Sequence, residues 1–263
     1  MKNRKHPISC FVIAFNEADR IGACLASLHQ WVDQLIVLDS GSTDDTVTIA
    51  KQYTDEVYCT DWPGYGVQRN RALAKCRHDW ILYPDADEVL SDALKVEIDN
   101  VLNQDQPGYN LIKIPWKTMM FGKPLAYGRY TALQEKLFYK PAAKFKEISV
   151  HETLDIQNPI TYVTKERLLH YSWRNYQHLQ DKHLQYAMLF AKERFEQGKR
   201  SSIGFALINF LYSFLWQYCV RLGCLDGKRG LVMAMTLAQY EYHKYAGIVA
   251  LQLEERSKHN FSS

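Results

Sequence analysis

The stretch Trp80-Ile81-Leu82-Tyr83-Pro84-Asp85-Ala86-Asp87-Glu88 decides the fold. Its hydrophobic run is predicted to be a buried strand, and the run ends in two carboxylates spaced i, i+2. Alternate residues of an extended segment point the same way, so Asp85 and Asp87 can converge on one point. Two hard oxygen donors in a cleft suit Mg²⁺ or Mn²⁺, and these ions suit a diphosphate. The plain alternative is a strand followed by the acidic N-cap of a helix that begins near Ser91.

Upstream of this stretch, strands and helices alternate. Besides the run at Trp80, we predict strands at residues 8–14, 35–38 and 57–59, and helices over residues 21–28, 46–53 and 65–76. Short connections in a β-α-β-α-β-α-β order predict an α/β fold with a mainly parallel sheet flanked by helices. Ligands of such sheets bind at the carboxyl ends of the strands. The sequence has no G-x-G-x-x-G after the first strand and no P-loop, so a nucleotide would be held by other means.

Downstream, the pattern changes twice. Residues 109–118 and 133–140 are predicted strands laid beside the parallel sheet, on either side of Phe121-Gly122-Lys123-Pro124. After Tyr171 the chain is predicted to be helical, over about residues 175–197, 202–221 and 227–253, and the last ten residues to be a frayed polar end. We therefore expect a domain over residues 1–174 and a helical C-terminal extension over residues 175–263.

Composition is compatible with one large α/β domain plus an appendage. The chain has 263 residues and a formal charge of +3, which gives no reason to expect a nucleic-acid partner. The charge is uneven, because the part from Thr164 onward carries 14 Lys or Arg against 8 Asp or Glu. None of the six cysteines forms a C-x-x-C pair or a zinc spacing, and no secretory leader is evident, which favours a reducing cytosol.

Four motifs in this order resemble those of glycosyltransferase family 2, which has the GT-A fold. They are residues 12–17 (Val-Ile-Ala-Phe-Asn-Glu), 39–46 (Asp-Ser-Gly-Ser-Thr-Asp-Asp-Thr), 68–70 (Gln-Arg-Asn) and 85–88 (Asp-Ala-Asp-Glu). The resemblance covers residues 7–175 well and the later helices more loosely. Within the family, the chain is most similar to bacterial transferases of the lipopolysaccharide inner core. The resemblance implies an inverting hexosyltransferase with a nucleoside-diphosphate sugar, most simply UDP-glucose, as donor.

The donor would lie across the carboxyl ends of the first strands. Ala14, Asn16 and Glu17 at the end of the first strand would face the nucleoside, although Asn16 and Glu17 can also be a simple cap. Asp39 can accept a hydrogen bond from the uracil imide or the ribose, or cap the next helix. The resemblance places Gln68 and Arg69 at the donor. Two roles are equally compatible with Arg69. It can be a fixed cation that pairs with the donor diphosphate, or a solvent-exposed residue on a helix face.

Asp87 is the preferred metal ligand, with Asp85 contacting the metal through water or holding the donor sugar or ribose. His170 is a candidate for completing the metal shell, against the alternative of a core histidine, and His151 is its rival. The resemblance places the catalytic base near His151 and Glu152, and Glu152 is the better match. The family often has an Asp or a Glu-Asp pair at this step, whereas this chain has His-Glu. The plain alternative for Glu152 is a structural ion pair with Lys144 or Lys146.

Residues 203–220 are almost wholly apolar, with interruptions at Asn209 and Gln217. Three interpretations compete: a core helix, an interfacial helix, and a membrane span near the lower length limit. A basic C-terminal part with an apolar helix fits peripheral contact with the cytoplasmic face of an anionic inner membrane. The acceptor would then be a glycolipid such as the lipopolysaccharide core. The alternatives are another donor or acceptor within the family, a sugar-1-phosphate nucleotidyltransferase, and a non-catalytic membrane-docked binding module.

Overall fold

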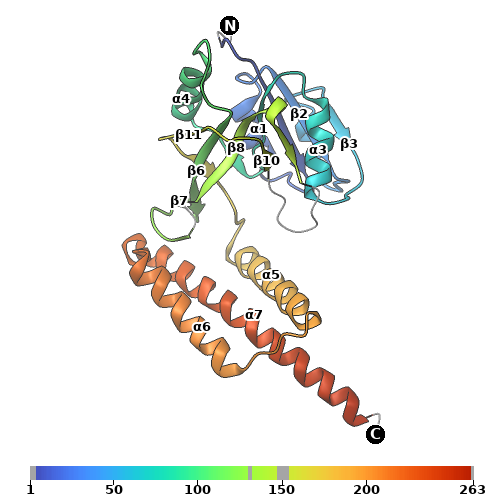
Figure 1. Cartoon of the computed structure of the whole chain (residues 1–263), viewed down its shortest axis with the longest axis vertical. Helices are drawn as coiled ribbons and strands as arrows, with labels where there is room; N and C mark the ends of the chain where they lie inside the picture. Colours follow the sequence, from blue (N-terminus) through green and yellow to red (C-terminus); the bar gives the residue numbers. More distant parts are fainter. Residues whose placement is uncertain (1–3, 130–131, 147–153, 262–263) are drawn as a thin grey trace. The chain divides into compact units, whose positions relative to one another are not determined.

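The computed structural model describes residues 4–129, 132–146 and 154–261. The chain divides into two compact units (Figure 1). The first comprises Met1–Lys117 and Ala132–Tyr171, and the second comprises Thr118–Thr131 and Ser172–Ser263. The strand-rich segments belong to the first unit and the three long C-terminal helices to the second. The predicted division into a domain over residues 1–174 and a helical C-terminal extension over residues 175–263 stays a prediction.

Four parallel strands form the first part of the sheet. They are β1 (Ile8–Ala14), β2 (Gln34–Asp39), β3 (Val57–Cys59) and β4 (Trp80–Leu82), in the spatial order β3-β2-β1-β4. The chain therefore builds outward from β1 to β3 and then returns to the other side of β1 with β4. This is the topological switch point at which α/β sheets bind ligands, at the carboxyl ends of the strands.

Both faces of this sheet are covered, which explains the unbroken hydrophobic runs in β1 and β2. Alternate residues of β1 enter two different core clusters, with Cys10 and Val12 on one side and Phe11 on the other. Helices α1 (Ile21–Leu28) and α4 (Asp92–Leu102) cover the first face. Helix α3 (Tyr65–Lys75) covers the second.

Antiparallel strands extend the sheet beyond β4. β8 (Leu133–Tyr139) pairs antiparallel with both β4 and β6 (Leu111–Met120). β6 also pairs with two short strands: parallel with β11 (Thr161–Val163) and antiparallel with β7 (Lys123–Pro124). β5 (Glu88–Val89) pairs antiparallel with β12 (Leu168–His170). β9 (Ala143–Phe145) and β10 (Leu154–Ile156) form a separate two-stranded sheet. The predicted mixed extension is confirmed.

Two predicted boundaries are wrong. The second helix, α2, covers only Thr46–Ala50, because its start contains four consecutive β-branched residues that lower helix propensity. The predicted frayed end is helical, since α7 runs from Gly227 to Phe261. Glu, Lys and Arg are good helix formers, and Arg200 forms an ion pair with Glu255 at 3.3 Å.

The second unit is built around α7, which packs against both α5 (Tyr176–Glu196) and α6 (Ile203–Leu215) (Figure 1). A π-helical turn, η3 (Trp216–Val220), continues α6, and a 3₁₀ turn, η4 (Gly223–Asp226), leads into α7. The contact of η4 with α7 requires glycine at position 230. A Cβ atom there would lie 1.8 Å from the carbonyl oxygen of Gly223.

Candidate functional site

The acids that follow β4 lie in a tight turn that its own groups close. The backbone N–H of Asp85 donates to Oε2 of Glu88 at 2.8 Å, and the N–H of Glu88 donates back to the carbonyl of Asp85 at 2.9 Å. The next helix, α4, is capped by the side chain of Ser91, which accepts from the N–H of Leu94. The capping alternative for the acids is therefore wrong, and their side chains face other partners.

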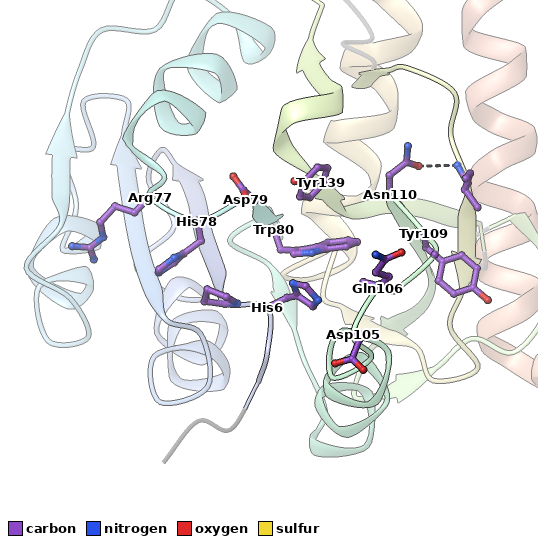
Figure 2. A pocket seen from close by; sticks show the side chains of 14 residues that line it. His6, Arg77, His78, Asp79, Trp80, Asp105, Gln106, Tyr109, Asn110 and Tyr139 are labelled. Atoms are coloured by element: carbon purple, nitrogen blue, oxygen red, sulfur yellow. Dashed lines mark hydrogen bonds between the residues drawn. The ribbon is translucent and has the colours of Figure 1, made fainter.

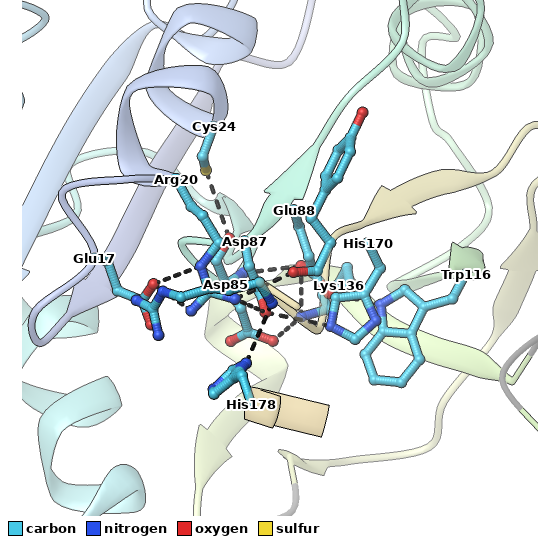
Figure 3. A network of polar contacts seen from close by, with 12 residues as sticks. Glu17, Arg20, Cys24, Asp85, Asp87, Glu88, Trp116, Lys136, His170 and His178 are labelled. Carbon is cyan, nitrogen blue, oxygen red and sulfur yellow. Dashed lines mark hydrogen bonds and ion pairs between the residues drawn. The ribbon is translucent and has the colours of Figure 1, made fainter. Parts of the chain in front are cut away.

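A buried lysine organises this turn (Figure 3). Nζ of Lys136, on β8, lies 2.8 Å from Oδ2 of Asp85 and 2.8 Å from Oε2 of Glu88. The Lys136 side chain is 5% exposed and that of Glu88 is not exposed at all. Burial acts to lower the pKa of Lys136, but the two carboxylates outweigh it and raise that pKa above its usual value. Burial raises the pKa of Glu88 in spite of the nearby ammonium.

Asp85 contacts a second cation. Nη2 of Arg69, on α3, lies 3.2 Å from Oδ1 of Asp85, and the guanidinium lies over the ring of Tyr83 at 5.2 Å. Burial acts to raise the pKa of Asp85, but Lys136 and Arg69 together lower it well below its usual value. Asp85 is thus an ionised carboxylate, and its two cationic partners come from β8 and α3.

Asp87 faces different partners. Its Oδ2 lies 3.6 Å from Nε2 of His170 and 3.4 Å from Nη1 of Arg20. Burial acts to raise the pKa of Asp87, but the neighbouring His170 and Arg20 outweigh it and lower that pKa. The His170 ring stacks on Trp116 with centroids 4.1 Å apart, and the indole N–H of Trp116 donates to Glu88 at 2.6 Å. Figure 3 shows this chain of contacts from Glu17 to Lys136.

The predicted donor residues on the first loops largely hold the loops together. Asn16 adopts a left-handed conformation (φ 52°) that asparagine tolerates, and its Oδ1 accepts from the N–H of Thr43 at 2.8 Å. Asp39 is 1% exposed and accepts from the N–H groups of Gly41 and Ser42. Gln68 is fully buried and donates to Ser40 and Thr60, at 2.9 and 2.7 Å.

The end of β1 lies next to these loops. The carbonyl of Ala14, which is 4% exposed, accepts from the N–H of Ser40 at 2.9 Å. Phe15, the following residue, is 56% exposed. Glu17 forms an ion pair with Arg20, whose Nε lies 2.8 Å from Oε2 of Glu17. The loops after β1 and β2 are therefore linked to each other at the carboxyl edge of the sheet, next to the exposed Phe15. Direct contact of Ala14, Asn16, Glu17, Asp39, Gln68 or Arg69 with a nucleotide stays a prediction.

The predicted base and its neighbour, Glu152 and His151, lie outside the described residues. Arg20, Lys136 and Trp116 are site residues that sequence reasoning missed. Lys136 carried no distinctive signal, because Glu135 and Lys140 are charged residues of the same predicted strand. Arg20 stands three residues after Glu17, a spacing that places the two side chains on one side of a helical turn.

Asp87 and His170 are the side chains of the candidate site that could hold a divalent cation. In the part of the chain that the structure describes, no group of three or more His, Cys, Asp or Glu side chains is placed to hold a metal. Asp85 contacts Lys136 and Arg69, whereas Asp87 contacts His170 and Arg20, and convergence of the two acids on one ion stays a prediction. Asp87 and His170 are adjacent, and carboxylate with imidazole suits Mn²⁺. Such ions commonly take their other ligands from substrate phosphates and water, so these two residues fit the group.

A separate cavity of about 690 Å³ lies at the other edge of the sheet (Figure 2). Its lining includes Trp80 at the start of β4 and Tyr139 at the end of β8, together with His6, His78 and Tyr109. None of the predicted site residues in the described part of the chain lines it. The candidate site is therefore the polar network at the carboxyl ends of β1 and β4, away from this cavity.

The sequence profile of glycosyl transferase family 2 matches residues 9–151, which is more than half of the chain. The chain belongs to glycosyl transferase family 2. The predicted family, the transferase activity and the α/β GT-A fold with a mainly parallel sheet and a helical C-terminal part are thereby confirmed. The matched residues include the β4 strand, the acidic turn and Lys136.

Relatives match over nearly the whole chain. An uncharacterized glycosyltransferase of Rickettsia felis is 33% identical over 88% of this chain and 85% of its own length. The lipopolysaccharide core biosynthesis glycosyltransferase LpsC of Rhizobium meliloti is 27% identical over 92% of this chain and 94% of its own. Glucosyl-3-phosphoglycerate synthase of Mycobacterium tuberculosis is 30% identical over 45% of each chain, with a TM-score of 0.36. That TM-score is too low to support a structural argument.

Proposed function

We propose that this family 2 transferase moves a hexose, most simply glucose from UDP-glucose, onto a bacterial surface glycolipid such as the lipopolysaccharide core, with inversion at the anomeric carbon. The similarity to LpsC over almost the full length of both chains supports the acceptor class. The observation that carries the proposal is the adjacency of Asp87 and His170, 3.6 Å apart, beside the carboxyl ends of β1 and β4. Nucleotide ligands of parallel α/β sheets bind at this kind of edge.

The residues of the network have separate proposed roles. Asp87 and His170 would hold Mg²⁺ or Mn²⁺, which would offset the charge that develops on the departing diphosphate. Arg20 contacts Glu17 and the carbonyl of Tyr171, which fix its guanidinium. The guanidinium also contacts Asp87 and would hold it in place. Asp85, fixed by Lys136 and Arg69, would accept hydrogen bonds from hydroxyl groups of the donor sugar or the ribose.

The nucleoside would lie over the loops after β1 and β2. The exposed ring of Phe15 offers a face for the base, next to Asn16 and Glu17. The two oxygens of Asp39 accept three hydrogen bonds, one from Gly41 and two from Ser42. A carboxylate has about four acceptor positions, so one remains for the nucleoside. Arg69 is within reach of a diphosphate that approaches Asp85.

Glu152 is the proposed general base. It would take the proton of the acceptor hydroxyl as that oxygen attacks the anomeric carbon, while the bond to the nucleoside diphosphate breaks. Its neighbour His151 is proposed to assist at the same place. Glu152→Gln is expected to abolish sugar transfer and leave donor binding intact, because the base is needed only when the acceptor reacts.

The experiment that tests the donor site compares Asp87→Asn with Asp92→Asn. Asp92 is an acid whose side chain is 98% exposed on α4, so it controls for loss of surface charge. Calorimetric titration of UDP-glucose in the presence of Mn²⁺ should show at least a tenfold weaker Kd for Asp87→Asn, about 1.4 kcal/mol, and no change for Asp92→Asn. Equal affinities for wild type and Asp87→Asn would contradict the assignment.

The donor itself is tested by thermal shift with Mn²⁺ and UDP-, GDP- or dTDP-glucose. A ligand at 100 times its Kd stabilises the folded protein by about 2.7 kcal/mol. UDP-glucose is expected to raise Tm the most, and a larger shift with GDP- or dTDP-glucose would replace it as the donor. We further propose that the enzyme acts at the cytoplasmic face of the inner membrane, where a glycolipid acceptor would be reached from the bilayer surface.

A further inference from the structure

The helix α6 and the π-helical turn that follows it present a broad apolar surface. We call this surface the α6 face; it consists of Ile203, Leu207, Ile208, Leu211, Tyr212, Leu215, Trp216 and Val220. Each of these side chains is between 39% and 65% exposed. Only 6% of the segment Ile203–Val220 is buried, although the segment is long and apolar enough to cross a membrane. Contiguous exposed apolar patches on soluble proteins mark interaction sites.

The opposite side of α6 is already used for packing. Ala206 and Ser213 are its buried residues, and α6 packs along α7. The helix is thus apolar on the side that packs and on the side that is exposed, which is unusual for a helix that faces water. One N–H of the Asn209 amide donates to the carbonyl of Phe205 within the same helix, at 2.8 Å. The core interpretation of residues 203–220 therefore accounts for only one side of the helix.

Positive charges stand at both ends of the α6 face. No residue from 201 to 220 is charged, whereas Lys199 and Arg200 precede the segment and Arg221 follows it, all three exposed. Arg200 also pairs with Glu255, so Lys199 and Arg221 are the cations that would meet a partner at this face. The acid nearest to this face in sequence, Asp226, accepts from the N–H groups of Ala126 and Tyr127. Two copies joined through this face in antiparallel orientation would bring like charges together, which disfavours a dimer. Anionic lipid headgroups would instead meet complementary charge.

A parallel orientation to the bilayer fits better than a span. α6 and η3 together reach only the lower length limit for crossing the hydrocarbon core. The helix α7, which packs along them, carries Glu241 and Lys244, and these form an ion pair at 2.8 Å. If α6 spanned the bilayer, these charges would have to enter the hydrocarbon core, which is unfavourable. Tyr212 and Trp216 suit the headgroup boundary, where amphipathic rings are enriched.

We infer that the α6 face docks the enzyme on an anionic lipid bilayer, with α6 lying in the plane of the headgroups and its exposed leucines inserted. The inference rests on the proposed function in one respect, since a glycolipid acceptor gives the docking a purpose. The binding itself depends only on the second unit and can be measured without a donor or acceptor.

The test is co-sedimentation of the full chain with vesicles of phosphatidylglycerol and phosphatidylethanolamine, or of phosphatidylcholine alone. The variant Leu207→Gln/Leu211→Gln removes apolar surface from the face with side chains that keep a helix. Its control is Leu189→Gln/Leu253→Gln on α5 and α7, where the leucines are 58% and 59% exposed against 50% and 58% for the test pair. We expect at least tenfold weaker binding to anionic vesicles for the test pair and no change for the control.

Binding should also weaken at least tenfold on phosphatidylcholine alone and in 0.5 M salt, since neighbouring cations contribute to it. Three results would overturn the inference: no binding of the wild-type chain to anionic vesicles, equal loss in both double variants, or a wild-type dimer that becomes a monomer in the test pair. Asp87→Asn should bind vesicles normally, and Leu207→Gln/Leu211→Gln should bind UDP-glucose normally. A failure of docking is thereby distinguished from a failure of the proposed function.

Discussion

Replacement of Lys136 by Met should destabilise the first unit strongly. The ammonium lies 2.8 Å from carboxylate oxygens of both Asp85 and Glu88. At an effective dielectric constant of about 20, each contact is worth about 6 kcal/mol before the cost of removing the charges from water. Breaking a buried pair by deleting one partner costs about 3–5 kcal/mol, because the remaining charge is left uncompensated.

The structure narrows this range. Arg69 still faces Asp85 at 3.2 Å after the substitution, so Asp85 keeps part of its compensation. Glu88 is fully buried and keeps only the neutral donors of Trp116 and of the Asp85 backbone. We therefore expect a loss of about 3–4 kcal/mol in the free energy of unfolding. Urea dependence of hydrogen exchange at the β1 amides is the appropriate assay, since it reports the first unit separately from the second.

Lys113→Met is the matched control. Lys113 forms an ion pair with Glu135 at 3.0 Å, but both side chains are about one-third exposed, so its removal should cost no more than about 1 kcal/mol. In double-mutant cycles, Lys136→Met with Glu88→Gln should show a coupling energy of at least about 2 kcal/mol. If Lys136→Met costs no more than Lys113→Met, the account of the buried network is wrong.

Two further predictions concern other parts of the chain. The Glu97 carboxylate accepts from the N–H groups of Lys165 and Glu166, and although burial acts to raise its pKa, these hydrogen bonds lower it. Its stabilisation is present above the ordinary carboxyl pKa and is lost as pH falls through the lower folded value, so Glu97→Gln should cost about 1–2 kcal/mol at pH 7 and little at pH 3, measured by urea unfolding. Gly230→Ala should destabilise the second unit by about 3 kcal/mol in the same assay, because its Cβ would overlap a backbone carbonyl. Gly204 is also helical, but its added Cβ would meet only Ser202 Oγ at 4.0 Å, an ordinary contact. Gly204→Ala should therefore be neutral or stabilising, and similar losses for both would refute the packing argument.

The parallel half of the fold was predictable because local signals agree there. The unbroken hydrophobic runs of β1 and β2 require cover on both faces, and the apolar spacing of Ile21, Leu25 and Leu28 marks the helix that supplies it. Chain order then places Asp39 and the turn after β4 at one edge of the sheet. Their proximity follows from the parallel arrangement and needs no knowledge of side-chain contacts.

The contacts inside the site were not predictable in the same way. Lys136 reaches the acids from β8, which is 51 residues from Asp85 along the chain and antiparallel to β4. The register of an antiparallel pair determines which residues face the turn, and a shift by one residue would turn Lys136 to the other face. Trp116 and His170 meet through β6 and β12, again by pairing between distant strands. Tertiary register, which local sequence does not encode, therefore determines the partner of each acid.

The two acids of the Asp85-Ala86-Asp87 turn consequently have different partners. Strand alternation suggested that both converge on one ion, but the turn closed by Glu88 ends the extended geometry on which alternation depends. Asp85 then contacts Lys136 and Arg69, while Asp87 contacts His170 and Arg20. Asp85 faces two cations, whereas Asp87 faces one, Arg20, together with an imidazole that can itself bind a metal. A divalent ion that brings its own diphosphate would gain most at Asp87, so this position is the one at which substitution should separate donor binding from stability.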